Sequence, residues 1–418
     1  MTAPTSPESS PGSHRTLVSS AALFLITLVL AVVFHYWRTI DSVWWIELGF
    51  VLSAATFIAV LISEACDPFS DAAQWIGCKL RLPPSVRGAT LDAVASSMPE
   101  LFTGLFFVVL ALSGSQDQTQ QLLDSAEGYG STIATCAGSS IYNLILIPAV
   151  CAIAMSFSRP ERPQIDVSRE VVNRDGMWVV FVQIGLLIFL FQPRLDWWMG
   201  VVALLTYVAY VSHLYFATRK FRARLDGGEI TPDDPSEKAT IFFGQCQVNL
   251  NGFTSAVILI CATLVAAMAC YLLVELTNES ARKLGVSPFF VAVILTAAVS
   301  SIPDTFMSLG SARRGDDSGA MSNVFGSNIF DICIGMSIPL IVCCYLNDWQ
   351  PVELIGANGE TLNGVVGLRV FLFVLTVVAM GCMWKFGRIT RTTGLVFCAL
   401  YGSFVTYAIL GALRILTI

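Results

Sequence analysis

The stretch TAAVSSIPDTF, residues 296–306, places a proline and a carboxylate side by side inside a long apolar run. Early in the chain, LDAVASSMPELF at 91–102 repeats the order of small residues, two serines, one apolar residue, proline and acid. A charged side chain at the centre of a bilayer costs roughly 2.5–3.5 kcal/mol on insertion scales. A proline beside it is expected to interrupt the helix that carries it. The two copies therefore indicate a functional site within a membrane.

The composition places both stretches in a membrane protein. The chain has 418 residues, of which 55% are hydrophobic and 13% are charged. Apolar runs of about 20 residues, the length needed to cross a bilayer, recur along it. Eleven spans are predicted, at 16–37, 43–66, 88–112, 128–156, 177–192, 196–217, 251–275, 286–311, 318–345, 366–385 and 392–416. The predicted fold class is all-α, a polytopic membrane protein.

The charges of the connecting loops predict the orientation. If the tail at 1–15 is cytoplasmic and the spans alternate, 18 of the 24 Lys and Arg residues lie on the cytoplasmic side. This asymmetry agrees with the positive-inside rule and puts the C-terminus outside. The span at 16–37 is expected to be an extra N-terminal helix, with a cleaved signal peptide as the alternative. The connection at 218–250 is then a short cytoplasmic loop, and a bacterial inner membrane is the expected location.

The two halves of the chain repeat each other. GATLDAVASSMPELFTG (88–104) matches AVILTAAVSSIPDTFMSLG (292–310) at an offset of 204. CAGSSIYNLILIP (136–148) matches VFGSNIFDICIGMSIP (324–339) at an offset of 188. In the predicted topology the first copy runs outward and the second inward. Inverted repeats with interrupted helices are typical of secondary transporters, whose binding site lies at the repeat interface.

The spans therefore divide into ten core helices and the N-terminal one. The first five-helix half covers 43–217, with its repeat at 88–156, and the second covers 251–416, with its repeat at 286–345. We expect these two halves to be inverted relative to each other.

The polar side chains of the repeats offer only oxygen-rich groups. Three are acids, Glu100, Asp304 and Asp331, and these are the candidate metal ligands. No Lys or Arg is expected at their depth, so a bound cation is the simplest counter-charge. The hydroxyl and amide groups that accompany them are those of Ser96, Ser97, Ser139, Asn143, Ser300, Ser301 and Ser327. Oxygen ligands suit Ca²⁺ and Na⁺, and the lack of His and Cys argues against zinc or copper.

The prolines and the net charge of the acids add two expectations. Pro99 and Pro303 should each free a backbone carbonyl one turn back, near Ala95 and Val299. The three acids together carry three negative charges, which three Na⁺ would cancel. One Ca²⁺ would leave a single negative charge for a K⁺ or a proton.

Asp92 lies two turns before Glu100 on the same helix face. Three interpretations stay open: an accessory cation or proton site, a residue at the cytoplasmic mouth, and a structural role.

These motifs closely resemble the two α-repeats of the cation/calcium exchanger superfamily. The second repeat, together with CDPFSDAAQWIGCKL at 66–80, is most similar to the potassium-dependent sodium/calcium exchanger branch. The resemblance implies exchange of Na⁺ for Ca²⁺ by alternating access, with K⁺ co-transport in that branch and no cofactor. It also implies that the ten residues named above, Asp92 excepted, are cation ligands. The chain departs from the family at Ala95 and Val299, where glycine is usual, and at Asp92, where an apolar residue is usual.

Three functions are compatible with these features. The first is a Na⁺/Ca²⁺ antiporter, with or without K⁺. The second is a relative that moves another divalent cation or uses protons, which Asp92 and the missing glycines favour. The third is an intramembrane aspartyl protease, which needs a Gly-x-Gly-Asp context that the buried acids lack. The expected partners are ions and the lipid bilayer rather than nucleic acid, and no enzymatic activity is expected.

Overall fold

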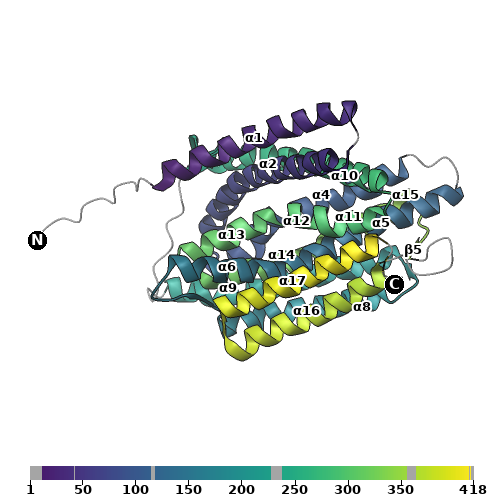
Figure 1. The fold of residues 1–418 in the computed structure, drawn as a ribbon. Helices are drawn as coiled ribbons and strands as arrows, with labels where there is room; N and C mark the ends of the chain where they lie inside the picture. Colours follow the sequence, from purple (N-terminus) through teal and green to yellow (C-terminus); the bar gives the residue numbers. More distant parts are fainter. Residues whose placement is uncertain are drawn as a thin grey trace, which may run out of the picture.

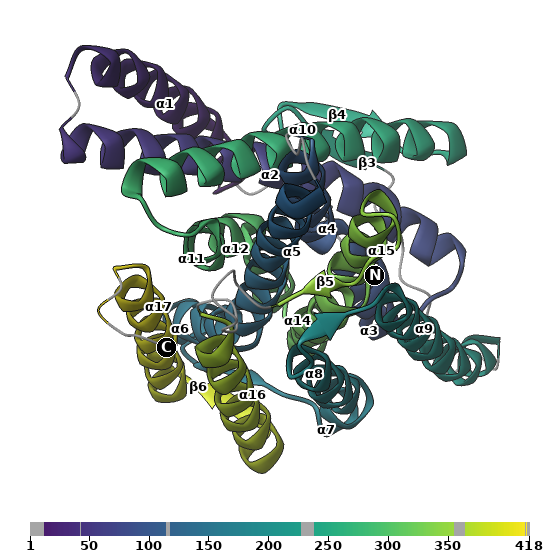
Figure 2. The ribbon, with the colours of Figure 1, turned by 90° about the vertical axis from the view of Figure 1, so that its right-hand side faces the viewer.

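The computed structural model describes residues 12–41, 43–113, 118–226, 238–354, 364–413 and 415. Eleven helical segments are long and apolar enough to span a membrane, which confirms the predicted all-α membrane fold. They lie side by side in one bundle (Figure 1), and Figure 2 shows the same bundle turned by 90°. The parts of the predicted tail at 1–11 and of the predicted loop at 227–237 lie outside the described residues.

The first half begins with a peripheral helix. Its helices are α1 Gly12–Ile40, α2 Trp44–Lys79, α3 Pro84–Arg87, α4 Ala93–Leu112, α5 Gln118–Ile141, α6 Ile147–Ser158, α7 Arg169–Val171, α8 Met177–Leu190 and α9 Trp197–Asp226. Helix α1 lies at one edge of the molecule beside α2 (Figure 2), and only 6% of its apolar window is buried.

The second half has the same kind of elements. Its helices are α10 Gly252–Leu284, α11 Pro288–Val291, α12 Ala297–Ser300, α13 Ile302–Arg313, α14 Asp317–Phe330, α15 Ser337–Leu346, α16 Val365–Phe386 and α17 Arg391–Ala412. Helices α2 and α10 pack against each other, whereas α4, α5 and α14 occupy the middle of the bundle (Figure 2).

Six short strands connect helix ends in antiparallel pairs. They are β1 Gln164–Asp166 with β6 Arg388–Thr390, β2 Arg194–Leu195 with β5 Val352–Glu353, and β3 Lys238–Ile241 with β4 Cys246–Asn249. The β3–β4 pair is a hairpin in the stretch that the sequence predicts as a short loop. The hairpin is held against α2, because the backbone N–H of Thr240 donates to Asp71 Oδ2 at 3.1 Å and that of Phe243 to Glu64 Oε2 at 2.9 Å.

Five π-helical turns interrupt the bundle: η1 Gly88–Asp92, η2 Tyr142–Leu146, η3 Val172–Gly176, η4 Ala292–Thr296 and η5 Asp331–Gly335. Segments η1 and η4 are 204 residues apart, which is the offset of the first pair of motifs. Segments η2 and η5 are 189 residues apart, within one residue of the offset of the second pair. Single π-turns inside helices are frequent at functional sites. Four of the five turns therefore belong to the repeats.

One expectation about the helices is wrong. The prolines of both repeats are predicted to interrupt their helices, but α4 runs unbroken through Pro99. Only the second repeat has a break, where Ser301 leaves the helical conformation (φ −86°, ψ 2°) between α12 and α13. A proline removes one backbone hydrogen bond, and a helix continues past it when the neighbouring turns keep theirs.

Several spans are longer than predicted, among them α2 and the span that includes α8. Helix α2 continues to Lys79, so that Glu64, Asp67 and Asp71 lie on a helix rather than at its end. The span predicted to start at 177 starts at Arg169. Polar residues on one helix face are compatible with a membrane helix when that face is covered by other helices.

Candidate cation site

The ten predicted ligands meet in the middle of the bundle. All ten side chains are 0% exposed. They come from both repeats: α4 carries Ser96, Ser97 and Glu100; α5 and η2 carry Ser139 and Asn143; α12, Ser301 and α13 carry Ser300, Ser301 and Asp304; α14 and η5 carry Ser327 and Asp331. The two copies of the sequence motif therefore form one enclosed cluster.

Ser139 is the centre of the hydrogen bonds in this cluster. Its Oγ lies 3.0 Å from Glu100 Oε1 and 2.8 Å from Asp331 Oδ2, and it can donate to either. Ser301 Oγ lies 2.7 Å from Ser139 Oγ and 3.2 Å from Glu100 Oε1. One hydroxyl therefore joins two carboxylates from different repeats.

Asn143 joins the remaining acid to this group. Its Nδ2 donates to Asp304 Oδ2 at 3.4 Å and to Asp331 Oδ2 at 3.3 Å. Ser327 Oγ donates to the other oxygen of Asp304 at 2.5 Å. The three carboxylates thus share neutral donors rather than a basic residue.

Four buried oxygens of the cluster have no hydrogen-bond partner. They are Ser97 Oγ, Glu100 Oε2, Asn143 Oδ1 and Asp331 Oδ1. Ser97 Oγ lies beside the Asp331 carboxylate without the geometry of a hydrogen bond. A buried oxygen without a partner is costly, and several of them together are suited to a cation.

Two of the predicted hydroxyls are directed mainly to the backbone. Ser96 Oγ donates to Asp92 O at 2.9 Å, and Ser300 Oγ to Ala297 O at 3.3 Å. Ser96 Oγ also lies 3.4 Å from Ser327 Oγ, which connects it to the Asp304 side of the cluster.

The central acids are not part of the ion pairs found in the described part of the chain. There, none of the ion pairs includes Glu100, Asp304 or Asp331. Over the same residues, no three His, Cys, Asp or Glu side chains lie close enough together to hold a metal ion by themselves. A cation at this site would therefore need the serine and asparagine oxygens as well as the carboxylates.

Two glycines allow the helices of the two repeats to approach closely. A Cβ on Gly326 would lie 2.5 Å from the carbonyl oxygen of Ala89 in η1. A Cβ on Gly138 would lie 3.0 Å from the carbonyl oxygen of Val293 in η4. Ala89 and Val293 are themselves equivalent residues of the two repeats. Each glycine thus brings the serine that follows it, Ser139 or Ser327, toward the other repeat.

A polar group next to the site was not predicted from the sequence. Gln183 Nε2 on α8 donates to Ser140 Oγ at 2.5 Å, and Ser140 Oγ donates to Asn328 Oδ1. Ser140 and Asn328 stand at equivalent positions in the two repeats. The third residue of the shared motif Gly-Ser-[Ser/Asn] is a serine in one repeat and an asparagine in the other. This difference could have indicated the contact, because a hydroxyl and an amide can form a hydrogen bond.

A buried ion pair was also missed. Arg174 and Asp175 lie in η3, and Arg174 Nη2 is 2.6 Å from Asp175 Oδ2. Arg174 Nη1 also donates to Ser85 Oγ at 3.0 Å, next to the start of the first repeat helix. Arg174 is therefore paired within its own turn and does not serve the central acids.

Asp92 lies outside the central cluster and beside a polar vestibule. The vestibule has a volume of about 780 Å³ and is lined by four acids, Glu64, Asp67, Asp71 and Asp92. Its inner end reaches Tyr142 and Thr305, where Thr305 Oγ1 donates to Tyr142 Oη at 3.1 Å. These two residues are the sequence neighbours of Asn143 and Asp304, so the lining of the vestibule comes within one residue of the cluster along the chain.

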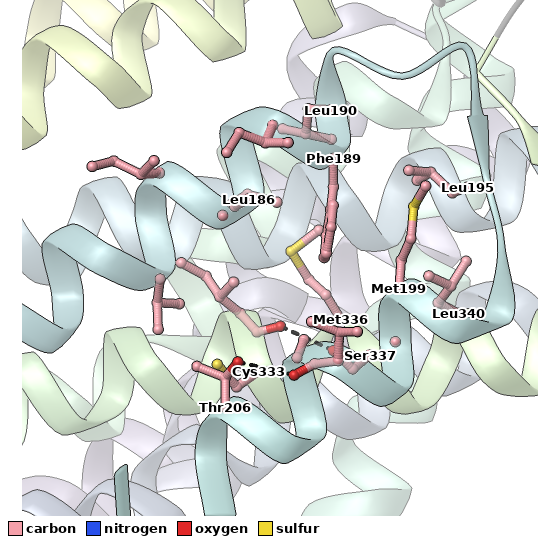
Figure 3. A pocket seen from close by; sticks show the side chains of 18 of the residues that line it. Leu186, Phe189, Leu190, Leu195, Met199, Thr206, Cys333, Met336, Ser337 and Leu340 are labelled. Atoms are coloured by element: carbon pink, nitrogen blue, oxygen red, sulfur yellow. Dashed lines mark hydrogen bonds between the residues drawn. The ribbon is translucent and has the colours of Figure 1, made fainter. Parts of the chain in front are cut away.

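A second cavity does not belong to the cation site. It has a volume of about 270 Å³ between α8, α9 and the η5–α15 segment, and apolar side chains such as Leu186, Met199 and Leu340 line it (Figure 3). No carboxylate lines it. Tyr129 Oη, which also lines this cavity, donates to Met336 O at 3.3 Å.

Comparison with known families gives a match over most of the chain. Residues 48–216 and 254–410 match the family described as sodium/calcium exchanger protein. Human sodium/potassium/calcium exchanger 2 is 32% identical over 151 residues, which are 36% of this chain and 22% of that protein. Bovine sodium/potassium/calcium exchanger 1 is 34% identical over 127 residues, which are 30% of this chain and 10% of that protein. The chain therefore matches less than a quarter of the length of these relatives.

Two solved structures share the fold. The sodium-calcium exchanger NCX_Mj, soaked with 2.5 mM Na⁺ and 0.1 mM Ca²⁺, has a TM-score of 0.52 and 20% identity, over 84% of this chain and 95% of that chain. The H⁺/Ca²⁺ exchanger CAX has a TM-score of 0.63 and 13% identity, over 97% of this chain and 94% of that chain. The family match and the sequence relatives confirm the predicted resemblance to the cation/calcium exchanger superfamily, and the two solved structures confirm the fold.

Proposed function

Since the chain belongs to the sodium/calcium exchanger protein family, we propose that it is a secondary antiporter that exchanges Na⁺ for Ca²⁺ by alternating access. Its ligands are Glu100, Asp304 and Asp331, with Asn143 and the six serines of the cluster. The energy for calcium movement comes from the sodium gradient, and the protein has no enzymatic activity.

The observation that carries this proposal is the enclosed oxygen cluster. Ca²⁺ takes about six to eight oxygen ligands, and Na⁺ accepts the same type of ligand. The four oxygens without partners, together with the carboxylate oxygens, provide that number without nitrogen or sulfur. Transporters built from inverted repeats bind their ions at the repeat interface, which is where both halves contribute here.

The charge of the site bears on the stoichiometry. A site with three carboxylates in a low-dielectric region changes its access from one side to the other most easily when bound cations cancel the charge of the carboxylates. Three Na⁺ achieve this in one direction. In the other, Ca²⁺ with K⁺ achieves it, and Ca²⁺ with one proton is the alternative. The mammalian relatives carry sodium, potassium and calcium in their names, which favours K⁺ co-transport.

Calcium/proton exchange, or exchange of another divalent cation, is the second candidate. Asp92 adds a fourth acid two turns from Glu100, and Ala95 and Val299 place methyl and isopropyl groups where the family usually has glycine. Both side chains are buried, with Ala95 0% and Val299 6% exposed. Extra bulk beside the freed carbonyls would alter the cation size that the site prefers.

The test is calcium uptake into proteoliposomes that contain the purified protein. Uptake of radioactive Ca²⁺ is measured while an outward Na⁺ gradient, a K⁺ gradient or a pH gradient is imposed in turn. Uptake driven by the Na⁺ gradient supports the proposal, and stimulation by K⁺ on the calcium side supports co-transport. Uptake that follows only the pH gradient favours the second candidate, and no uptake under any gradient refutes both.

We also propose that the N-terminus lies in the cytoplasm of a bacterial cell and the C-terminus outside. The distribution of Lys and Arg in the loops supports this orientation. Protease digestion of terminal tags in intact cells and in inverted vesicles tests it.

A further inference from the structure

We propose that Asp92 receives the divalent cation on the vestibule side of the site and makes the two sides of the transporter unequal in calcium affinity. This inference rests on the proposed antiport function and concerns how cations reach the same site. In this proposal Asp92 attracts the entering cation, whereas the equivalent position of the second repeat has no carboxylate.

The position of Asp92 places it between the vestibule and the cluster. The side chain is only 8% exposed, and that exposed part faces the vestibule of about 780 Å³. Its Oδ1 accepts hydrogen bonds from Ser70 Oγ at 3.2 Å and from Gln74 Nε2 at 3.1 Å. Both of these hydrogen-bond donors are neutral, while the positive charges of Arg87 and Arg314 also act on the Asp92 carboxylate.

A chain of short contacts runs from Asp92 to the central acids. Ser96 Oγ donates to the backbone oxygen of Asp92 at 2.9 Å and lies 3.4 Å from Ser327 Oγ. Ser327 Oγ in turn donates to Asp304 Oδ1 at 2.5 Å. Every atom in this chain is an oxygen, so a cation that leaves Asp92 meets oxygen ligands up to Asp304.

The other acids of the vestibule are held differently. Glu64 and Asp71 each accept a backbone N–H of the β3–β4 hairpin, at 2.9 and 3.1 Å. Arg314 also lines the vestibule. Asp92 is therefore the vestibule acid that lies nearest to the cluster along the chain, and its hydrogen bonds come from two side chains of α2 rather than from the hairpin.

The inverted repeat shows what stands at the equivalent place on the opposite side. At the offset of 204, Asp92 corresponds to Thr296, the last residue of η4. Thr296 Oγ1 lies 2.7 Å from Thr277 Oγ1 on α10, the helix that precedes the second repeat as α2 precedes the first. A neutral hydroxyl pair thus replaces the carboxylate and its two neutral donors.

The opposite face does have acids, but they lie farther from the cluster. A smaller cavity of about 290 Å³ there is lined by Asp124, Glu127 and Glu275 together with Arg282. Neither cavity is lined by a cluster residue, but the vestibule reaches Tyr142 and Thr305, which are sequence neighbours of Asn143 and Asp304, whereas the smaller cavity reaches only Phe107 and Ser131, seven and eight residues from Glu100 and Ser139. The difference between the two sides is therefore greatest at the turn next to the ligands. A fixed charge at that distance attracts a divalent cation about twice as strongly as a monovalent one.

The experiment compares the two sides of the membrane with Asp92→Thr, which gives the first repeat the residue of the second. Sodium-driven calcium transport is measured in inside-out and right-side-out vesicles, whose orientation is assigned by protease access to an N-terminal tag. We expect the KM for calcium to rise about three- to tenfold on the N-terminal side. On the other side it should change by less than about twofold, and the maximal rate should be retained.

An equal rise on both sides, or no rise on either, would overturn the assignment. Asp92→Glu keeps the charge and should restore the KM, whereas Asp92→Asn is used if the threonine variant does not fold and should behave like it. Thr296→Val is the matched control, because it removes the equivalent hydrogen bond without altering charge. If the hydrogen bond at this turn has only a structural role, Thr296→Val should shift the KM for calcium on the opposite side by a similar factor. If the wild-type protein shows no sodium-driven transport, the proposed antiport function is refuted. That result differs from the outcomes above, which concern Asp92 alone.

Discussion

Asn143 and Asp331 hold equivalent positions in the two repeats, and their side chains meet, with Asn143 Nδ2 donating to Asp331 Oδ2 at 3.3 Å. Two acids at these positions would repel each other, and the cluster would then carry four negative charges. Two amides would leave only two. The difference between the copies sets the number of carboxylates at three and lets one copy donate a hydrogen bond to the other.

Removing the charge of a central acid should stop transport. Glu100→Gln and Asp304→Asn keep the size of each side chain but remove one charged ligand. We expect calcium flux to fall by roughly 10- to 100-fold, since a contact to a charged group is worth about 1.5–3 kcal/mol. Flux in proteoliposomes and elution in gel filtration are measured together. Glu161→Gln, at an exposed loop position, is the control, and wild-type flux in both test variants would remove these acids from the site.

Adjacent serines should have separable effects. Ser139→Ala removes contacts to Glu100, Asp331 and Ser301, whereas Ser140→Ala removes the contact to Asn328. We expect Ser139→Ala to weaken calcium binding about threefold to tenfold, as measured by the KM for uptake. Ser140→Ala should lower the free energy of unfolding by about 1–3 kcal/mol, because it leaves buried amide groups without partners. The same effect on KM from both variants would contradict this division.

A methyl group at Gly326 should force the repeats apart. The added Cβ would lie 2.5 Å from the carbonyl oxygen of Ala89, and backbone atoms cannot move aside as a flexible side chain can. We expect Gly326→Ala to lower the free energy of unfolding by about 1–3 kcal/mol and to reduce flux. Thermal unfolding in detergent measures the change. Gly402→Ala is the matched control, since nothing lies within 4 Å of its added Cβ; equal destabilisation by both would contradict the packing argument.

The buried ion pair of η3 should matter more than an exposed one. Asp175 is 0% exposed, so Asp175→Asn leaves the Arg174 guanidinium without a charged partner. We expect a loss of about 3–5 kcal/mol in the free energy of unfolding. The exposed pair of Arg194 and Glu353, 62% and 43% exposed at the side chains, provides the comparison. Glu353→Gln should cost no more than about 1 kcal/mol, and a similar loss in the two variants would show that burial is not the cause.

The ligands could be identified from the sequence because they are polar residues repeated in an apolar background. A carboxylate within a long apolar run needs a counter-charge. Its second occurrence in a matching motif indicates the repeat, and the topology predicted from the loop charges indicates the inversion. All ten residues named from the motifs are fully buried. Which role each has in transport stays a prediction.

Other features depend on packing that no local pattern reveals. The helix through Pro99 is continuous although the same proline in the second repeat lies beside a break. A proline only removes one hydrogen bond, and the surrounding packing decides whether the helix continues. Gln183 is a single amide on an apolar helix, and only the fold brings its Nε2 to within 2.5 Å of Ser140. The hairpin over Glu64 and Asp71 joins residues that are 179 and 169 positions apart in sequence.

The contact between Ser140 and Asn328 has a consequence for how the duplicated halves diverged. Once a gene has doubled, mutations usually accumulate in either copy independently. Here a residue of one copy and its own counterpart in the other are bonded to each other, so neither can drift alone. An exchange of both residues at once, serine for asparagine and asparagine for serine, would keep a hydroxyl facing an amide, although the two positions lie 188 residues apart.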